Sequence, residues 1–170
     1  MKELVLIPIA LICAVMVVGL QQVTHERIDA NQERFEHQQM IAMLPDPNET
    51  ISQESTLFRT FKGSQPTGLI VQATTDFGYN DKISFWLAVD LKQEIRGVSV
   101  IRHRETPGIA DFIEGQWLDQ FQGASSDNDW NTSSGDFDNV TGATITSNTM
   151  ITGIETALRE LKESSERDAQ

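Results

Sequence analysis

The first regular feature of the chain is an apolar run from Leu4 to Leu20, interrupted only by residues that a helix tolerates. A helix needs about 20 apolar residues to cross a bilayer, and this run of about 17 is near the short end of that range. A cleaved signal peptide is the alternative, but the leading region carries only Lys2, offset by Glu3, and no small-x-small cleavage site follows. We therefore predict a retained transmembrane anchor over residues 1–24.

The next segment, residues 25–47, is mostly polar, with a ragged apolar face at helical spacing. Its end is marked by Leu44-Pro45, because the residue before a proline avoids helical geometry. This pattern predicts a stalk helix that carries the following domain off the membrane.

An alternating pattern then replaces the helical one. In Lys82–Leu91, one face carries Phe85, Leu87 and Val89 and the other carries Ser84, Trp86 and Ala88, an alternation that predicts a strand in a half-buried sheet. A second strand is predicted over Ile95–Ile101 after a short turn, so the two form an antiparallel hairpin. Residues 69–74 are strand-like in their β-branched content, and residues 50–63 fit either an edge strand or a loop.

Helical spacing returns in the C-terminal half. Apolar residues within 112–121 predict a short helix packed on the sheet, and those within 150–161 predict a longer one that begins just after Thr144. Residues 165–170 are predicted to form a flexible charged tail. The predicted fold class is therefore α+β, with one domain over residues 48–164 built on a mostly antiparallel sheet with packed helices.

Composition narrows the possible chemistry. The net charge of −12 argues against nucleic-acid binding, which needs a positive face. Cys13 is the single cysteine, so the chain has no internal disulfide, iron–sulfur ligand set or zinc spacing. The acidic loop 127–138 resembles a calcium loop but has Thr132 where that loop requires glycine, so we predict no metal site. Any redox chemistry must use a bound organic cofactor or a partner.

The stretch Asp138–Ser147 carries the strongest candidate chemistry. Its Gly142-Ala143 pair lets a bulky group approach the backbone closely, and Thr141, Thr144 and Thr146 place hydroxyls around that gap. A turn that enters a helix presents free backbone N–H groups, which suit a phosphate. The alternative is a Thr/Ser cap of the helix with no ligand.

The sequence Asp138-x-x-Thr141-Gly142-Ala143-Thr144 resembles the flavinylation motif of FMN-binding subunits of bacterial respiratory complexes, most closely the G subunit of the Rnf-type complexes. Residues 135–138 and 103–108 and the apolar N-terminus extend the likeness over most of the chain. The resemblance implies FMN bound by a phosphoester to Thr144, attached by a separate flavin transferase that uses FAD. It also implies a single-pass subunit of the bacterial inner membrane, with the flavin domain in the periplasm.

In this family the role implied is electron transfer between neighbouring subunits of an ion-translocating oxidoreductase, not activity as a stand-alone enzyme. Two alternatives remain: the C subunit of the sodium-translocating NADH:quinone reductase, which shares the motif, and a non-catalytic anchored binding or assembly module. The predicted cofactor-binding residues are Thr141, Gly142, Ala143, Thr144 and Thr146, with Glu105, Thr106, Pro107 and Gly108 from an upstream loop that lies near the flavin in the family.

We expect that upstream loop to leave a strand at the centre of the sheet and to fold over the flavin, with Glu105 beside the ring. The family continues this loop with Leu-Gly-Asp-Lys, whereas this chain has Ile109-Ala110-Asp111-Phe112, which puts any role of the second and fourth positions in doubt. His103 is either a general base or a surface histidine, and electron transfer through a flavin requires no base.

Overall fold

The computed structural model describes residues 2–46, 48–54, 57–76 and 78–168. The chain divides into two compact units, Met1–Gln38 and Gln39–Gln170. Helix α1, Lys2–Ala42, makes up the described part of the first unit, and only its last residues belong to the second.

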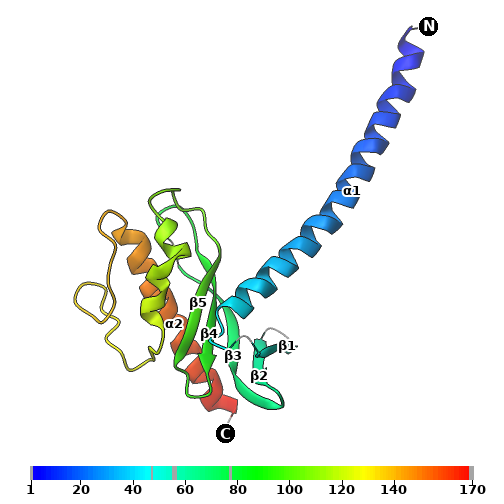
Figure 1. Ribbon diagram of the computed structural model, residues 1–170. Helices are drawn as coiled ribbons and strands as arrows, with labels where there is room; N and C mark the ends of the chain where they lie inside the picture. The colour runs from blue at the N-terminus through cyan, green and yellow to red at the C-terminus, as the bar shows by residue number, and fades with distance from the viewer. Residues whose placement is uncertain (1, 47, 55–56, 77, 169–170) are drawn as a thin grey trace. The chain divides into compact units, whose positions relative to one another are not determined.

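A five-stranded sheet forms the centre of the second unit (Figure 1). Each strand pairs antiparallel with the next one along the chain, so the prediction of an antiparallel sheet in an α+β domain is confirmed. The strands are β1 Thr50–Glu54, β2 Leu57–Lys62, β3 Gln65–Thr74, β4 Ser84–Asp90 and β5 Ile95–Arg102. The segment that the sequence left open between edge strand and loop is therefore a strand pair.

The position of β5 corrects one expectation. This strand is the last in the order β1-β2-β3-β4-β5, so the loop that follows it leaves an edge of the sheet and not its centre. The edge is paired at its first residue, because Ile95 accepts a hydrogen bond from Gly123 N–H at 2.8 Å and donates one to Ala124 O at 2.7 Å. These contacts hold the chain after β5 against the strand it has just left.

Alternation along β4 divides the core between the two faces of the sheet. Phe85, Leu87 and Val89 contribute to the larger core, while Trp86 and Ala88 contribute to a smaller core on the opposite face. Both faces of β4 are buried, although the sequence pattern indicated a half-buried strand. The smaller core is completed by Met40 and Leu44, together with Phe58, whose ring meets Trp86 edge-on at 5.4 Å.

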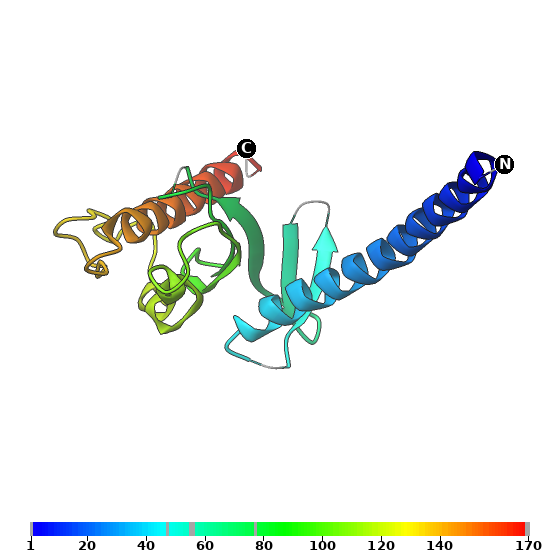
Figure 2. The same cartoon turned by 90° about the horizontal axis from the view of Figure 1, so that it is seen from above.

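The larger core is covered by three helical elements: η1 Asp111–Glu114, η2 Gln116–Phe121 and α2 Thr144–Asp168 (Figure 2). The first two are short 3₁₀ helices where the sequence predicted one helix over 112–121. Gly115 separates them with an extended backbone, φ −125° and ψ −160°, which interrupts the helical path. Helix α2 also includes residues 165–168, which the sequence assigned to a flexible tail.

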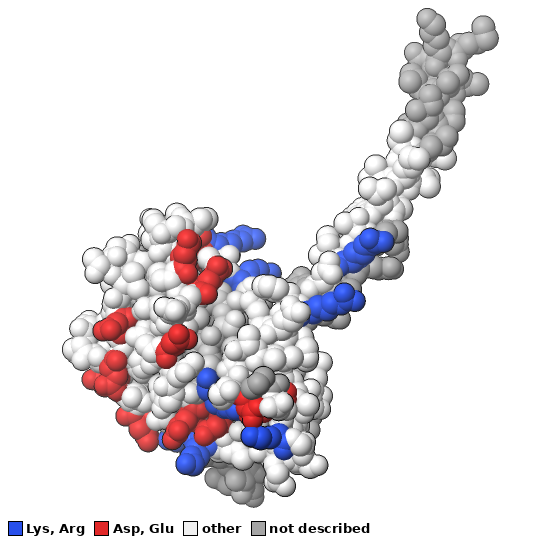
Figure 3. All heavy atoms as spheres, viewed as in Figure 1, with Lys and Arg blue, Asp and Glu red and all other residues white. Residues whose placement is uncertain are grey.

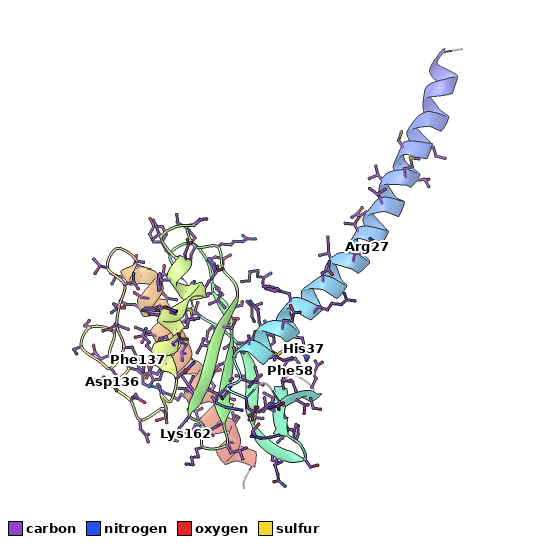
Figure 4. All side chains as sticks on the ribbon, in the orientation of Figure 1. Arg27, His37, Phe58, Asp136, Phe137 and Lys162 are labelled. Carbon is purple, nitrogen blue, oxygen red and sulfur yellow. The ribbon has the colours of Figure 1, made fainter. Side chains whose placement is uncertain are left out.

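An aromatic cluster fills the space between η2 and the loop that leads to α2. Phe121 is fully buried, and its ring lies 5.3 Å from Trp117 and 4.9 Å from Phe137. Trp130 stacks parallel to Phe121 and contacts Phe137 at 4.3 Å (Phe137 is labelled in Figure 4). The loop is therefore anchored by large apolar side chains even though most of its residues are polar.

The predicted anchor and stalk fall on α1. Within the described part of the chain, no helix combines the length and the hydropathy that a membrane crossing requires. Within residues 1–24, the side chains of residues 1–10, 12, 22 and 23 lie outside the described residues, and that finding does not extend to them. The anchor over residues 1–24 stays a prediction.

Replacing Phe121 by alanine should destabilise the protein most among single substitutions in this cluster. Removing a fully buried aromatic ring leaves a cavity, and such changes lower the free energy of unfolding by about 3–5 kcal/mol. Urea unfolding followed by tryptophan fluorescence measures the loss. Leu91→Ala is the control, because Leu91 is 67% exposed and its truncation should change stability by less than about 0.5 kcal/mol. Equal losses in the two variants would contradict the packing described here.

Candidate functional site

A pocket of about 410 Å³ opens where three segments of the second unit converge. These segments are the β3–β4 loop, the loop after β5, and the start of α2. The volume falls within the range of small-molecule sites, and the lining is mostly apolar with a few polar groups, as such sites usually are. The lining residues are Tyr79, Glu105, Thr106, Ile109, Ala110, Gly142, Thr144, Ile145 and Thr146.

The start of α2 forms one wall. Val140 O accepts a hydrogen bond from Ala143 N–H at 3.0 Å, and this turn places Gly142 at φ +89°, a conformation that favours glycine. A side chain added at Gly142 would meet no atom within 4 Å, so the space above it is open. The helix has no acidic residue in its first turn, and the first backbone N–H groups of any helix lack an intrahelical acceptor. The positive end of α2 is therefore available to an anion.

Helix η2 holds the residue that opens the Thr-rich motif. Asp138 O accepts a hydrogen bond from Trp117 Nε1–H at 2.9 Å, and Asp138 N–H donates one to Gln120 Oε1 at 2.7 Å. The sequence placed Trp117 in the core only. Its indole therefore has a second role, because it fixes the chain six residues before the start of α2.

A buried carboxylate joins the three walls. Glu105 is only 5% exposed, and its Oε2 accepts the hydroxyl hydrogen of Thr146 at 2.6 Å. Its Oε1 accepts Asn80 N–H at 3.0 Å. Burial raises the pKa of Glu105, but hydrogen bonds from Thr146 and from the backbone of residues 79–81 outweigh burial and hold that pKa below its ordinary value. Glu105 is therefore ionised at neutral pH.

The structure brings together part of the predicted site. Five of the predicted residues line the pocket: Glu105, Thr106, Gly142, Thr144 and Thr146. Four others do not line it, namely Pro107 and Gly108 in the exposed turn, Thr141 in the approach to α2, and buried Ala143. Gly108 has φ +81°, and its N–H donates to Asp111 Oδ1 at 2.8 Å, so Pro107-Gly108 shapes the loop from outside the pocket.

Four lining residues were not predicted: Tyr79, Ile109, Ala110 and Ile145. Tyr79, Ile109 and Ile145 are large side chains that are 66%, 56% and 54% exposed. One indirect signal was present in the sequence, since Ile109 and Ala110 directly follow the family-like loop. Nothing local in the sequence connects Tyr79 with Thr144, because the pairing of β3, β4 and β5 creates that proximity.

His103, the candidate general base, is not among the residues that line the pocket. Its Nδ1 accepts Glu105 N–H at 3.2 Å and its Nε2 lies 2.9 Å from Glu114 Oε1. Both ring nitrogens are thus engaged with the protein. In the described chain, no group of three or more His, Cys, Asp and Glu side chains is arranged to hold a metal ion.

A second hollow, of about 240 Å³, lies along another part of α2, between that helix and the end of β3. It is lined by threonines and other polar residues, including Asp76 and Asn148. It contains no residue of the Thr-rich motif before the helix and none of the loop after β5. The larger pocket is therefore the better candidate for a ligand that contacts both the Thr-rich motif and the loop after β5.

Comparison with known proteins also favours the larger pocket as the ligand site. Residues 78–159 match the family described as the FMN-binding domain, and this range contains every lining residue of the larger pocket. The match covers just under half of the chain, and it agrees with the resemblance inferred from the motifs.

Several relatives are named as the G subunit of an ion-translocating oxidoreductase complex. The protein of Shewanella baltica is 27% identical over 175 residues, covering 88% of this chain and 82% of its own. The protein of Salmonella typhi is 36% identical over 110 residues, covering 59% of this chain and 53% of its own. The protein of Cronobacter sakazakii is 34% identical over 113 residues, covering 61% of this chain and 54% of its own.

The lowered pKa of Glu105 leads to a pH-dependent stability. A carboxyl whose pKa is depressed by folding stabilises the protein above its ordinary pKa, and this contribution is lost as the pH falls through the lowered value. At neutral pH we expect Glu105→Gln to lower the free energy of unfolding by about 1–3 kcal/mol, the scale of hydrogen bonds to a charged group.

Urea unfolding of both proteins at neutral and acidic pH measures this difference, which should shrink on acidification. Glu155→Gln is the matched control, because Glu155 forms a surface pair with Arg159 and should contribute less than about 1 kcal/mol. A difference between wild type and Glu105→Gln that stayed constant with pH would show that the ionised carboxylate is not the stabilising form.

Proposed function

We propose that this protein is an electron-transfer subunit of an ion-translocating oxidoreductase complex and that it carries FMN in the larger pocket, bound covalently to Thr144. One observation carries the proposal: the fold brings Thr144, the last residue of the flavinylation-like motif, into one pocket with Glu105 and Thr106 of the upstream loop. The relatives named as the G subunit of such a complex supply the context.

The residues around Thr144 fit the phosphate end of FMN. Thr144 is exposed at the first position of α2, where free N–H groups and the helix dipole favour an anion. Neither Lys nor Arg lines the pocket among the described residues. Without a cationic side chain, ionic attraction alone would hold the phosphate weakly in a chain of net charge −12, and a covalent bond removes that weakness.

The other lining residues suit a flat aromatic ring. Tyr79, Ile109 and Ile145 present apolar surface around the opening, and Ala110 is small and buried. The bound flavin would supply the redox chemistry by accepting and donating electrons. The residues of the chain would orient the ring, exclude water from part of it and leave an edge accessible to a partner.

Attachment requires a separate flavin transferase acting on FAD. In this step Thr144 Oγ1 forms a bond to the phosphorus of the FMN half, the phosphoanhydride bond breaks, and AMP leaves with that electron pair. The hydroxyl proton of Thr144 passes to a base on the transferase. The exposure of Thr144 gives such an enzyme access to it.

The apolar N-terminal run would anchor the protein in the bacterial inner membrane as a single-pass helix, with the flavin domain in the periplasm. The second unit is acidic on the face seen in Figure 3. Neighbouring membrane subunits of the complex would deliver electrons to this domain and receive them from it. The remainder of α1, residues 25–42, would connect anchor and domain.

Thr144→Ala should abolish covalent flavin and leave the fold intact, because this side chain is exposed and lies outside both hydrophobic cores. The variant, produced with a flavin transferase, should be colourless after denaturation and washing, and its intact mass should equal that of the bare chain. Thr152→Ala is the control, since it removes an exposed hydroxyl from α2 outside the motif and should keep the flavin. Covalent flavin in Thr144→Ala would overturn the assignment.

Deleting residues 1–23 should release the protein from membranes. The full chain should sediment with the membrane fraction, whereas the shortened chain should remain in solution with the circular dichroism of a folded α+β domain, because the sheet and its helices lie within Gln39–Gln170. Equal distribution of the two forms between membrane and soluble fractions would contradict the anchor.

A further inference from the structure

We propose that Glu105 is a positioning residue: its buried carboxylate ties the β3–β4 loop and the start of α2 to the loop after β5, so that the three walls of the pocket hold one arrangement. This inference rests on the proposed function for the identity of the ligand. The contact itself exists in the chain without flavin and is testable there.

Both oxygens of the carboxylate point into the protein. Oε2 is occupied by the Thr146 hydroxyl at 2.6 Å and Oε1 by Asn80 N–H at 3.0 Å. The backbone of Tyr79 and Asp81 also contributes hydrogen bonds, so with only 5% of the residue exposed the carboxylate has little capacity left for a ligand. This differs from the expectation that Glu105 acts directly on the flavin ring.

The β3–β4 loop is shaped around this carboxylate. A Cβ atom added at Gly78 would lie 2.7 Å from Glu105 Oε1 and 2.8 Å from Asp81 O, so the carboxylate approaches the loop as closely as it does only because residue 78 is glycine. The turn is closed by Gly78 N–H donating to Asp81 O at 2.9 Å. Tyr79, which lines the pocket, is part of this turn.

A second set of hydrogen bonds connects the β3–β4 loop with the loop after β5 at the surface. Asn80 Nδ2 donates to Arg104 O at 3.1 Å and approaches Thr106 Oγ1 at 3.4 Å. These contacts are exposed and compete with water, so each contributes less than a buried bond to a charged acceptor. The buried carboxylate is therefore the main connection between the β3–β4 loop and the loop after β5.

The same carboxylate completes the start of α2. No acidic residue lies in the first turn of this helix, although a carboxylate there favours helix formation. Glu105 supplies that charge from another segment through Thr146, which is 3% exposed and whose hydroxyl donates to it. Thr144, at the first position of the helix, stays exposed.

Because one carboxylate contacts both segments, a substitution in α2 should have a measurable effect on the β3–β4 loop. Thr146 donates to Glu105, while the 79–81 backbone reaches the same carboxylate from the other side. Thr146→Val removes only the hydroxyl and keeps the shape of the side chain. If the carboxylate joins the walls, this change in α2 should also loosen the β3–β4 loop.

The test is hydrogen–deuterium exchange of the full chain purified without flavin. In Thr146→Val and in Glu105→Gln, the amides of residues 79–81 should exchange roughly tenfold faster, the change that corresponds to about 1.4 kcal/mol, while those of β4 should change by no more than the measured loss of unfolding free energy requires. Thr146→Ser, which keeps the hydroxyl, should behave like wild type. Thr152→Val, the same substitution at an exposed position of α2, is the matched control.

Unchanged exchange of residues 79–81 in Thr146→Val would overturn the proposal, as would an acceleration of these amides that the measured loss of unfolding free energy fully explains, because that result indicates global destabilisation alone. In the flavin-loaded chain, both variants should keep the adduct mass but allow iodide to quench flavin fluorescence several-fold more than in wild type. If the wild-type chain acquires no flavin, the proposed function fails, whereas the exchange experiment still decides the role of Glu105.

Discussion

The hydrogen bond between Thr146 and the ionised, buried carboxylate of Glu105 is the contact on which the pocket depends. A carboxylate is stable in such a place only if its oxygens are occupied by donors, and here a helix hydroxyl and loop amides provide them. Removing one donor leaves a charge that is buried and only partly satisfied. The three walls therefore cannot separate independently, and the sheet, through β3, β4 and β5, sets where each wall begins.

The electrostatic environment that favours an anion at this site comes from backbone N–H groups and not from cationic side chains. Gly142 opens the approach to α2, and the helix presents unpaired N–H groups at Thr144. Glu105 accepts the hydroxyl hydrogen of Thr146 in the first turn of the same helix, while Thr144 stays exposed. An anion bound there relies on amide dipoles and, under our proposal, on a covalent bond.

Local repetition in the sequence predicted much of the fold but not all of it. Alternation placed Phe85 on the correct face of β4, and the Gly142-Ala143 gap lies at the start of a helix, as expected. The split of one helix into two at Gly115 was not predicted, because apolar spacing alone does not report a break in backbone conformation. The burial of the second face of β4 was not indicated either.

Non-local contacts could not be predicted from the sequence. Tyr79 reaches the pocket only through strand pairing, and Glu105 acts through Thr146, 41 positions away along the chain. Local patterns identify which residues are available, and the fold determines which of them meet.

Covalent FMN at Thr144 is tested most directly by fragmentation mass spectrometry of the wild-type chain produced with a flavin transferase. Trypsin should release residues 105–159 as one peptide, because no Lys or Arg lies between Arg104 and Arg159. We expect this peptide to carry the mass of one FMN less water, and we expect fragmentation to place that mass on Thr144. A peptide of unmodified mass, or an adduct on another residue, would contradict the assignment.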